Sequence, residues 1–374
     1  MVKAVTLEDS DRWRDPALTV RALRVRALMV PLDDPIVTAS GTIEASPIVL
    51  TDIVTDGDIT GSSYIFTYSP AALKPAADLI ANLEPLICGQ PLAPLGMEKA
   101  LRDTFRLLGD TGLVGMGVAA IDMGLWDALA KARGVPLAVL LGGALKPVPA
   151  YYSASMVDEA TAARHAEAAA SQGYRGFKVK AGHKTLEQDL SVIRAIRAVL
   201  GADAALMVDY NQSLSLSEAK SRIAALDAEN IAWAEEPLRH HDTAGHAELR
   251  AHVETPVQMG ENWWGVDDMA RNIAAGACDL CMPDAMRIGG VTGWLAAAAL
   301  AETHKLPMST HAFPEISGQL MAVTPTAHWL EMLDKARPIL QNPVEVVDGT
   351  LIPDAEPGAG LRWDEDAVKR YQVE

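Results

Sequence analysis

Seven ionisable residues recur along the C-terminal two-thirds of the chain, at intervals that would each hold one strand and one helix. They are Lys180, Asp209, Glu235, Glu261, Asp284, His311 and Glu331. Most follow a short apolar run, and an unpaired buried charge is costly, so chance does not explain the repetition. In a parallel β/α barrel the carboxyl ends of all strands meet at one rim, where catalytic groups lie. The spacing therefore predicts one active site that receives one residue from each strand.

Three carboxylates, Asp209, Glu235 and Glu261, end three consecutive predicted strands. Alone, each could be an ordinary solvated strand end. Together they would repel one another unless a cation held them, and an all-oxygen ligand set suits Mg²⁺. The triplet therefore predicts a magnesium site.

Two kinds of base accompany these acids. Lys178 and Lys180 lie on the same face of one strand, where their mutual repulsion and a nearby divalent cation would lower the pKa of Lys180, so that it can act as a base. Asp284 and His311 end two further strands, and a carboxylate beside an imidazole orients it and raises its basicity. The alternatives are a solvated basic strand end and a structural histidine.

Two more polar residues complete the predicted rim. Glu331 follows an apolar His-Trp-Leu run, and we expect it to be protonated and to donate a hydrogen bond to an anionic oxygen. Asn211 lies two residues after Asp209 and is expected to contact substrate or a metal-bound water. A metal and a lysine that grip a carboxylate, with a base on each side of the α-carbon, predict a racemase that works through an enediolate.

The elements that position these residues divide the chain into three parts. Residues 1–145 contain predicted strands followed by helices, which indicates an α+β domain. Residues 146–342 alternate strand and helix, which predicts an α/β barrel, and residues 343–374 should pack back on the first domain. The predicted barrel strands are 149–154, 175–180, 205–209, 231–235, 256–260, 279–283, 307–311 and 328–331.

Composition limits the partners and the compartment. A net charge of −17 argues against nucleic acid or an anionic membrane, but not against a small anionic substrate. The charged N-terminal stretch lacks a signal-peptide core, we find no apolar run near membrane length, and three cysteines give no disulfide framework. We therefore expect a cytoplasmic protein.

Several longer stretches resemble the mandelate racemase subgroup of the enolase superfamily. They are GFKVKAG, MVDYNQSL, WAEEPL, PVQMGENW, MPDAMRIGGVTGW, STHAFPEIS and TPTAHWLE. The resemblance implies a modified TIM barrel, (β/α)7β, with an N-terminal capping domain, one Mg²⁺ per subunit and a homo-octamer. It also assigns roles to the site residues: Asp209, Glu235 and Glu261 as metal ligands, Lys180 as the base for the S enantiomer, His311 with Asp284 as the base for the R enantiomer, Lys178 neutralising the substrate carboxylate, and Glu331 hydrogen-bonded to it.

Substrate choice is expected to depend on two loops of the capping domain, near 31–46 and 63–70. The pocket residues that we expect from these loops and their surroundings are Ile36, Thr38, Ile43, Phe66 and Tyr68. They are mostly apolar, which favours a mandelate-like 2-hydroxy acid. Acidic residues in the first loop leave a second interpretation open, the dehydration of an acid sugar at the same site. A catalytically silent carboxylate-binding protein is disfavoured, because every ligand and base is present.

Overall fold

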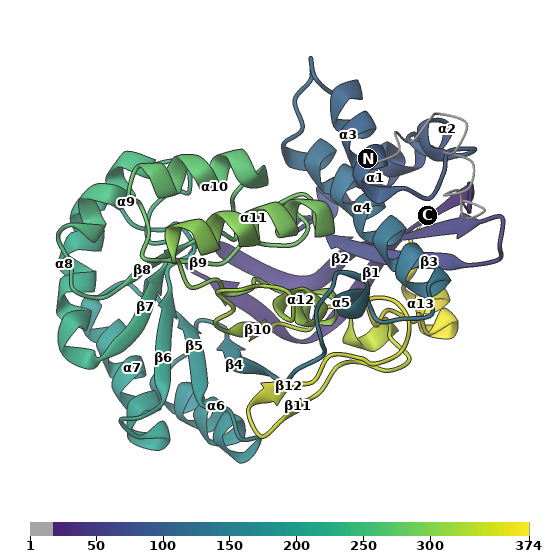
Figure 1. The fold of residues 1–374 in the computed structure, drawn as a ribbon. Helices are drawn as coiled ribbons and strands as arrows, with labels where there is room; N and C mark the ends of the chain where they lie inside the picture. Colours follow the sequence, from purple (N-terminus) through teal and green to yellow (C-terminus); the bar gives the residue numbers. More distant parts are fainter. Residues whose placement is uncertain (1–17, 374) are drawn as a thin grey trace, which may run out of the picture.

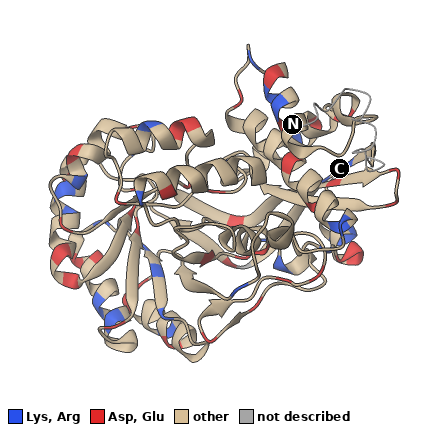
Figure 2. Ribbon diagram, viewed as in Figure 1, with Lys and Arg blue, Asp and Glu red and all other residues tan. Residues whose placement is uncertain are grey.

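The computed structural model describes residues 18–373, which form a capping domain beside a β/α barrel (Figure 1). The N-terminal stretch in which we expect no signal peptide lies outside the described residues. Basic and acidic residues are mixed along the outer helices of the barrel (Figure 2).

The capping domain is built on an antiparallel sheet of order β1-β2-β3. Its strands are β1 (Val20–Thr38), β2 (Gly41–Thr55) and β3 (Thr60–Phe66). The helices that follow are α1 (Pro70–Ala81), α2 (Glu84–Ile87), α3 (Pro94–Thr104), α4 (Gly112–Ala132) and α5 (Leu137–Leu140). Strands followed by helices give the expected α+β arrangement.

Helix α4 is the core helix of this domain. A Cβ at Gly61 of β3 would lie 2.0 Å from the carbonyl oxygen of Gly124, so α4 and the sheet approach as closely as glycine allows. The helix has 21 residues, and an 18-residue window within it has a mean hydropathy of 1.5, which is enough to span a membrane by length and composition. We expected no apolar run near membrane length; this helix reaches that length, although Asp122 and Asp127 interrupt its apolar sequence. In the folded chain 78% of its apolar window is buried, as in the core helix of a globular domain.

The barrel strands are parallel and follow one another in chain order from β4 to β9, and β10 pairs with β4. They are β4 (Val148–Ala154), β5 (Gly176–Lys180), β6 (Ala205–Asp209), β7 (Ile231–Glu235), β8 (Val257–Met259), β9 (Leu280–Cys281) and β10 (Leu330–Met332). The helices between them are α6 (Glu159–Ser171), α7 (Leu186–Leu200), α8 (Leu216–Leu226), α9 (Thr243–Arg250), α10 (Gly265–Ala274), α11 (Gly290–His304) and α12 (Pro314–Met321). A short 3-10 helix, Asp227–Glu229, follows α8. The predicted (β/α)7β barrel with its capping domain is confirmed.

One predicted strand, 307–311, is not a regular strand. The segment makes isolated parallel bridges, from Met308 to Cys281 and to Ala327 and from His311 to Asp284. Pro307 has no N–H to donate, which limits continuous pairing here. The bridges still connect β9 to the start of β10 and close the barrel.

The segment 31–46 was expected to be a loop, but it is the outer end of the β1–β2 hairpin, with a register shift between Pro31 and Ile36. This hairpin extends from the capping domain to the barrel (Figure 1). At its tip the hydroxyl of Ser40 donates to the carbonyl of Asn211 at 2.6 Å, and Met156 N–H donates to the carbonyl of Val37 at 2.8 Å. The capping domain therefore reaches the barrel with regular structure.

The C-terminal segment returns to the capping domain. It contains a 3-10 helix (Arg337–Ile339) before β11 (Val346–Val347), β12 (Thr350–Leu351) and α13 (Glu365–Tyr371). Asp52 of β2 is 2% exposed and accepts from Arg26 at 2.7 Å and from the indole of Trp363 at 2.8 Å. Arg26 also pairs with Glu365 at 2.6 Å. These bonds attach the last helix to the sheet.

Replacing Asp52 with alanine should destabilise the protein, because it leaves the buried Arg26 without its main partner. Loss of one member of a buried ion pair typically costs about 3–5 kcal/mol. We expect a change of that size in the free energy of unfolding, measured by urea denaturation. Glu248→Ala, which removes a surface pair with Lys220, is the matched control and should change it by less than about 1 kcal/mol. Equal effects of the two variants would contradict this account of the C-terminal attachment.

Candidate active site

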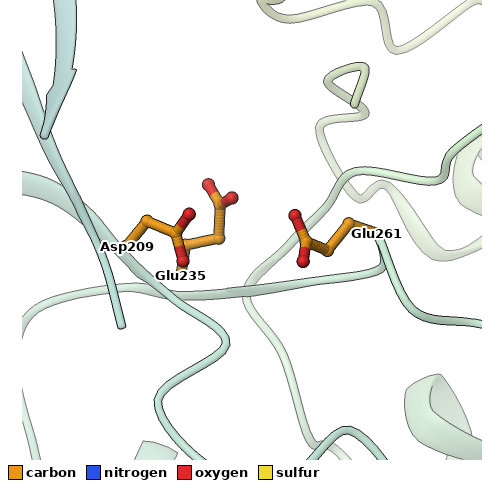
Figure 3. Close-up of side chains that lie close together, drawn as sticks. All are labelled: Asp209, Glu235 and Glu261. Atoms are coloured by element: carbon orange, nitrogen blue, oxygen red, sulfur yellow. The ribbon is translucent and has the colours of Figure 1, made fainter. Parts of the chain in front are cut away.

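Three carboxylates converge at the carboxyl ends of β6, β7 and β8. Asp209 and Glu235 are the last residues of their strands, and Glu261 follows β8 through Gly260. Gly260 has φ of +140°, and a Cβ there would lie 2.9 Å from the backbone of Met282, so this turn requires glycine. One oxygen from each carboxylate lies within 4.8 Å of the others, and Figure 3 shows Asp209 and Glu235 facing Glu261.

The triad has the chemistry of a site for a hard divalent cation. All three residues are buried, and their donors are all oxygen, as Mg²⁺ prefers. Burial raises the pKa of Glu235 well above its usual value, and the charges of Asp209, Glu331 and Glu261 add to this against the attraction of Lys178. A cation held by the triad would relieve this repulsion and supply positive charge to an anionic substrate.

Two buried lysines from β5 already compensate part of this charge. The Lys178 ammonium lies 2.5 Å from Glu235 and 2.8 Å from Glu331, and the Lys180 ammonium lies 2.7 Å from Asp209. Because side chains alternate along a strand, both lysines project to the same side, as expected.

Without a bound cation, the pKa of Lys180 is not lowered as expected from the lysine pair. Burial and the neighbouring Lys178 do oppose its charge, but the attraction of Asp209 outweighs them, so the pKa of Lys180 is raised. The sequence spacing of the two lysines does not show that Asp209 lies beside Lys180. A divalent cation bound at the triad would oppose the Asp209 charge and shift the pKa of Lys180 downward.

Glu331 was expected to be protonated, and the structure contradicts this. Burial alone would raise its pKa, but the charges of Lys178 and His311 outweigh burial, so the pKa of Glu331 is lowered. Its carboxylate accepts from Ala312 N–H at 3.1 Å and from Ser153 Oγ at 2.9 Å. It is a hydrogen-bond acceptor that fixes Lys178, not a donor.

The imidazole of His311 lies at the other end of the triad. Its Nδ1 is 2.6 Å from Asp284 Oδ2, and its Nε2 is 3.1 Å from Glu261 Oε2. Asp284 is itself fixed by the backbone N–H groups of Met286 and Arg287. The buried carboxylate therefore orients the imidazole and leaves Nε2 directed to the site, as expected for a histidine base.

A cavity of about 380 Å³ lies over these groups, between the hairpin and the rim. The residues that line it are Ile36, Thr38, Ser40, Gly41, Thr42, Ile43, Tyr68, Lys180, Asn211, Gln212, Arg239, Glu261, Asn262, Arg287, His311, Leu333 and Lys335. Five other site residues do not line the cavity but contact residues at or beside it: Asp209, Glu235, Lys178, Asp284 and Glu331.

Phe66 was expected in the pocket but does not line it. Phe66 is 1% exposed, and its ring packs against Tyr68 with centroids 4.6 Å apart. In a continuing strand the side chains of Phe66 and Tyr68 would project to the same side. Tyr68 has φ of +59°, however, so the backbone turns after β3. This turn brings Tyr68 to the cavity and leaves Phe66 beneath it.

Four further residues at the site were not among the predicted site residues. Asn262 donates to Glu261 at 2.8 Å and to Glu236 at 2.5 Å, and so orients a metal-ligand candidate. Burial and the charge of Glu261 raise the pKa of Glu236 to about 8. Arg287 donates to Asn262, and Lys335 reaches the cavity from beyond β10. Of the four, only Glu236 and Asn262 could have been found from the sequence, because each directly follows a predicted metal ligand.

Family models match both parts of the chain. The mandelate racemase / muconate lactonizing enzyme N-terminal domain matches residues 20–142, and the enolase C-terminal domain-like model matches residues 161–367. The chain therefore belongs to the mandelate racemase / muconate lactonizing enzyme family and is an enzyme of the enolase superfamily.

Individual relatives differ in what they bind or convert. An enolase from Bradyrhizobium, crystallised with magnesium and mandelic acid, is 44% identical with a TM-score of 0.93, covering 96% of this chain and 100% of that one. An enolase from alphaproteobacterium BAL199 with bound magnesium is 39% identical with a TM-score of 0.93, covering 95% and 100%. The L-talarate/galactarate dehydratase of Salmonella typhimurium is 31% identical over 71% of this chain and 68% of that protein.

Magnesium should stabilise the folded protein, because a cation relieves the repulsion within the triad. Binding at 100 times the dissociation constant adds about 2.7 kcal/mol. We expect Mg²⁺ to raise the melting temperature of the wild type, and Glu261→Gln to abolish that rise. Glu248→Gln, an exposed substitution of the same kind, should retain it. A melting temperature that does not respond to Mg²⁺ in the wild type would contradict a metal site here.

Proposed function

We propose that the protein is a Mg²⁺-dependent racemase of mandelate-like 2-hydroxy acids that transfers a proton at the α-carbon. The observation that carries the proposal is the placement of two different bases at opposite ends of one carboxylate triad. Lys180 adjoins Asp209 at one end, His311 adjoins Glu261 at the other, and both line the same cavity.

The order of strands explains why the bases flank the triad. Lys180 ends β5, the ligand candidates follow on β6, β7 and β8, and His311 comes from the segment beyond β9. A substrate carboxylate held at the triad would have its α-carbon between a lysine and a histidine. Removal of the α-proton by one base, followed by donation of a proton from the conjugate acid of the other base to the opposite face, inverts the stereocentre.

The cavity supports an apolar substituent on that carbon. Ile36 and Ile43 of the hairpin and Leu333 after β10 form part of its lining. The Bradyrhizobium relative with bound mandelic acid supports the same substrate type.

Dehydration of an acid sugar is the second candidate. Polar residues of the lining, including Thr38, Ser40 and Gln212, could pair with sugar hydroxyls. The Salmonella dehydratase relative favours this outcome at the same kind of site.

Proton NMR in D2O distinguishes the two candidates. With Mg²⁺ present, we expect (R)-mandelate to lose its α-proton signal and its optical rotation. Retention of both, together with conversion of galactarate to a keto acid, would sink the racemase proposal in favour of dehydration.

The two bases should be separable by mutation. His311→Asn should reduce α-proton exchange from (R)-mandelate by about 10²–10⁴-fold, because a positioned base is lost. Exchange from (S)-mandelate, measured by NMR in D2O, should remain measurable through Lys180. The exposed His304→Asn variant is the matched control and should exchange both enantiomers normally. Equal losses for both enantiomers in His311→Asn would show that the bases do not act independently.

A further inference from the structure

Lys335 is a buried cation in the cavity that has no carboxylate partner among residues 18–373. It is 5% exposed and lines the same cavity as Lys180 and His311. Its ammonium nitrogen lies 3.9 Å from the ring centroid of Phe66 and 5.1 Å from that of Tyr68. Within the described chain, these two aromatic rings are the partners of its ammonium group.

The other buried cations of this cavity have hydrogen-bond acceptors, and Arg239, which also lines it, is exposed to solvent. Lys178 has two carboxylates within 2.8 Å, Lys180 has one at 2.7 Å, and Arg287 donates to Asn262. The simplest structural explanation of Lys335, a stem packed on aromatic rings, accounts for its methylene groups but not for its charge. A buried ammonium is costly unless it has an acceptor, and for Lys335 the cavity is where one can come from, either water or the molecule that displaces it.

The charge on Lys335 is present near neutral pH. Burial lowers the pKa of Lys335 to about 8, and the charges of Glu331, Asp284 and Glu261 oppose this shift. These three carboxylates act on it from the metal end of the cavity without forming ion pairs with it.

We propose that Lys335 determines specificity by binding a second anionic group of the substrate, remote from the carboxylate held at the triad. Among the proposed 2-hydroxy acids, those that carry a second carboxylate at the far end of their substituent should then bind more tightly than the matching monoacids. This inference rests on the proposed function, because it assumes that the first carboxylate lies at the triad.

The charges of the cavity wall support a dianion. Lys180, Arg239, Arg287 and Lys335 line the cavity, whereas Glu261 is the one acidic residue among the described side chains that line it, in a chain whose net charge is −17. The phenyl groups of Phe66 and Tyr68 hold the Lys335 ammonium by cation–π contacts while one side stays available to the cavity. The two rings thus hold the Lys335 ammonium at the cavity without neutralising its charge.

Matched acids test this role by binding rather than by turnover. Mandelate and 4-carboxymandelate differ by one distal carboxylate, and galactonate and galactarate differ by the oxidation of the terminal carbon to a carboxylate. Titration calorimetry with Mg²⁺-loaded wild type should show that the diacid of at least one pair binds roughly 10- to 100-fold more tightly than its monoacid. Lys335→Met keeps an apolar stem against Phe66 and should abolish that preference while leaving the monoacid within about twofold.

Two further variants control the result. Lys335→Arg keeps the charge and should retain the preference, and Lys74→Met removes an exposed lysine of α1 and should change nothing. Equal binding of diacid and monoacid in both pairs by the wild type, or a preference that survives in Lys335→Met, would overturn the inference. Normal binding without α-proton exchange from any of the four acids would instead overturn the proposed function and leave the role of Lys335 standing.

Discussion

Compensation of buried charge at the barrel rim is the constraint on which the rest of this structure depends. Asp209, Glu235 and Glu331 are almost fully removed from solvent, and so is Lys178. Separately, each of these charges would be strongly destabilising, and together they form a network in which each lysine touches at least one carboxylate. The parallel barrel makes this possible, because it brings the ends of consecutive strands to one place.

The same network defines what the site can do. The two lysines and Glu331 fix the carboxylates at one end, and Asp284 and His311 complete the other. Glu236 and Asn262 hold Glu261 from behind. The capping hairpin then covers the rim, and the bond from Ser40 to the carbonyl of Asn211 connects the substrate wall directly to the loop after β6. The barrel supplies the ionisable groups of the site, and the capping domain supplies much of the cavity wall that faces them.

Much of this could be predicted from the sequence, because the informative residues end strands of regular spacing. That pattern predicts the barrel, the carboxylate triad, and the placement of Lys180 and His311 at the same site. The protonation of Lys180 and Glu331 could not be predicted, since it depends on which opposite charge lies nearest in space. The positions of Phe66 and Lys335 depend on a positive φ at Tyr68 and on packing between distant segments, and neither leaves a periodic signal. The segment 31–46 was expected to be a loop from the family resemblance alone, whereas it forms the end of a β-hairpin with a register shift between Pro31 and Ile36.

The central claim is that the buried triad holds the cation on which proton abstraction depends. The most direct measurement is α-proton exchange of (R)-mandelate in D2O as a function of Mg²⁺ concentration, starting from protein treated with EDTA, beside calorimetric titration of Mg²⁺. The account predicts no exchange without the metal and half-maximal exchange at the calorimetric dissociation constant. Exchange at the full rate after removal of the metal would contradict it.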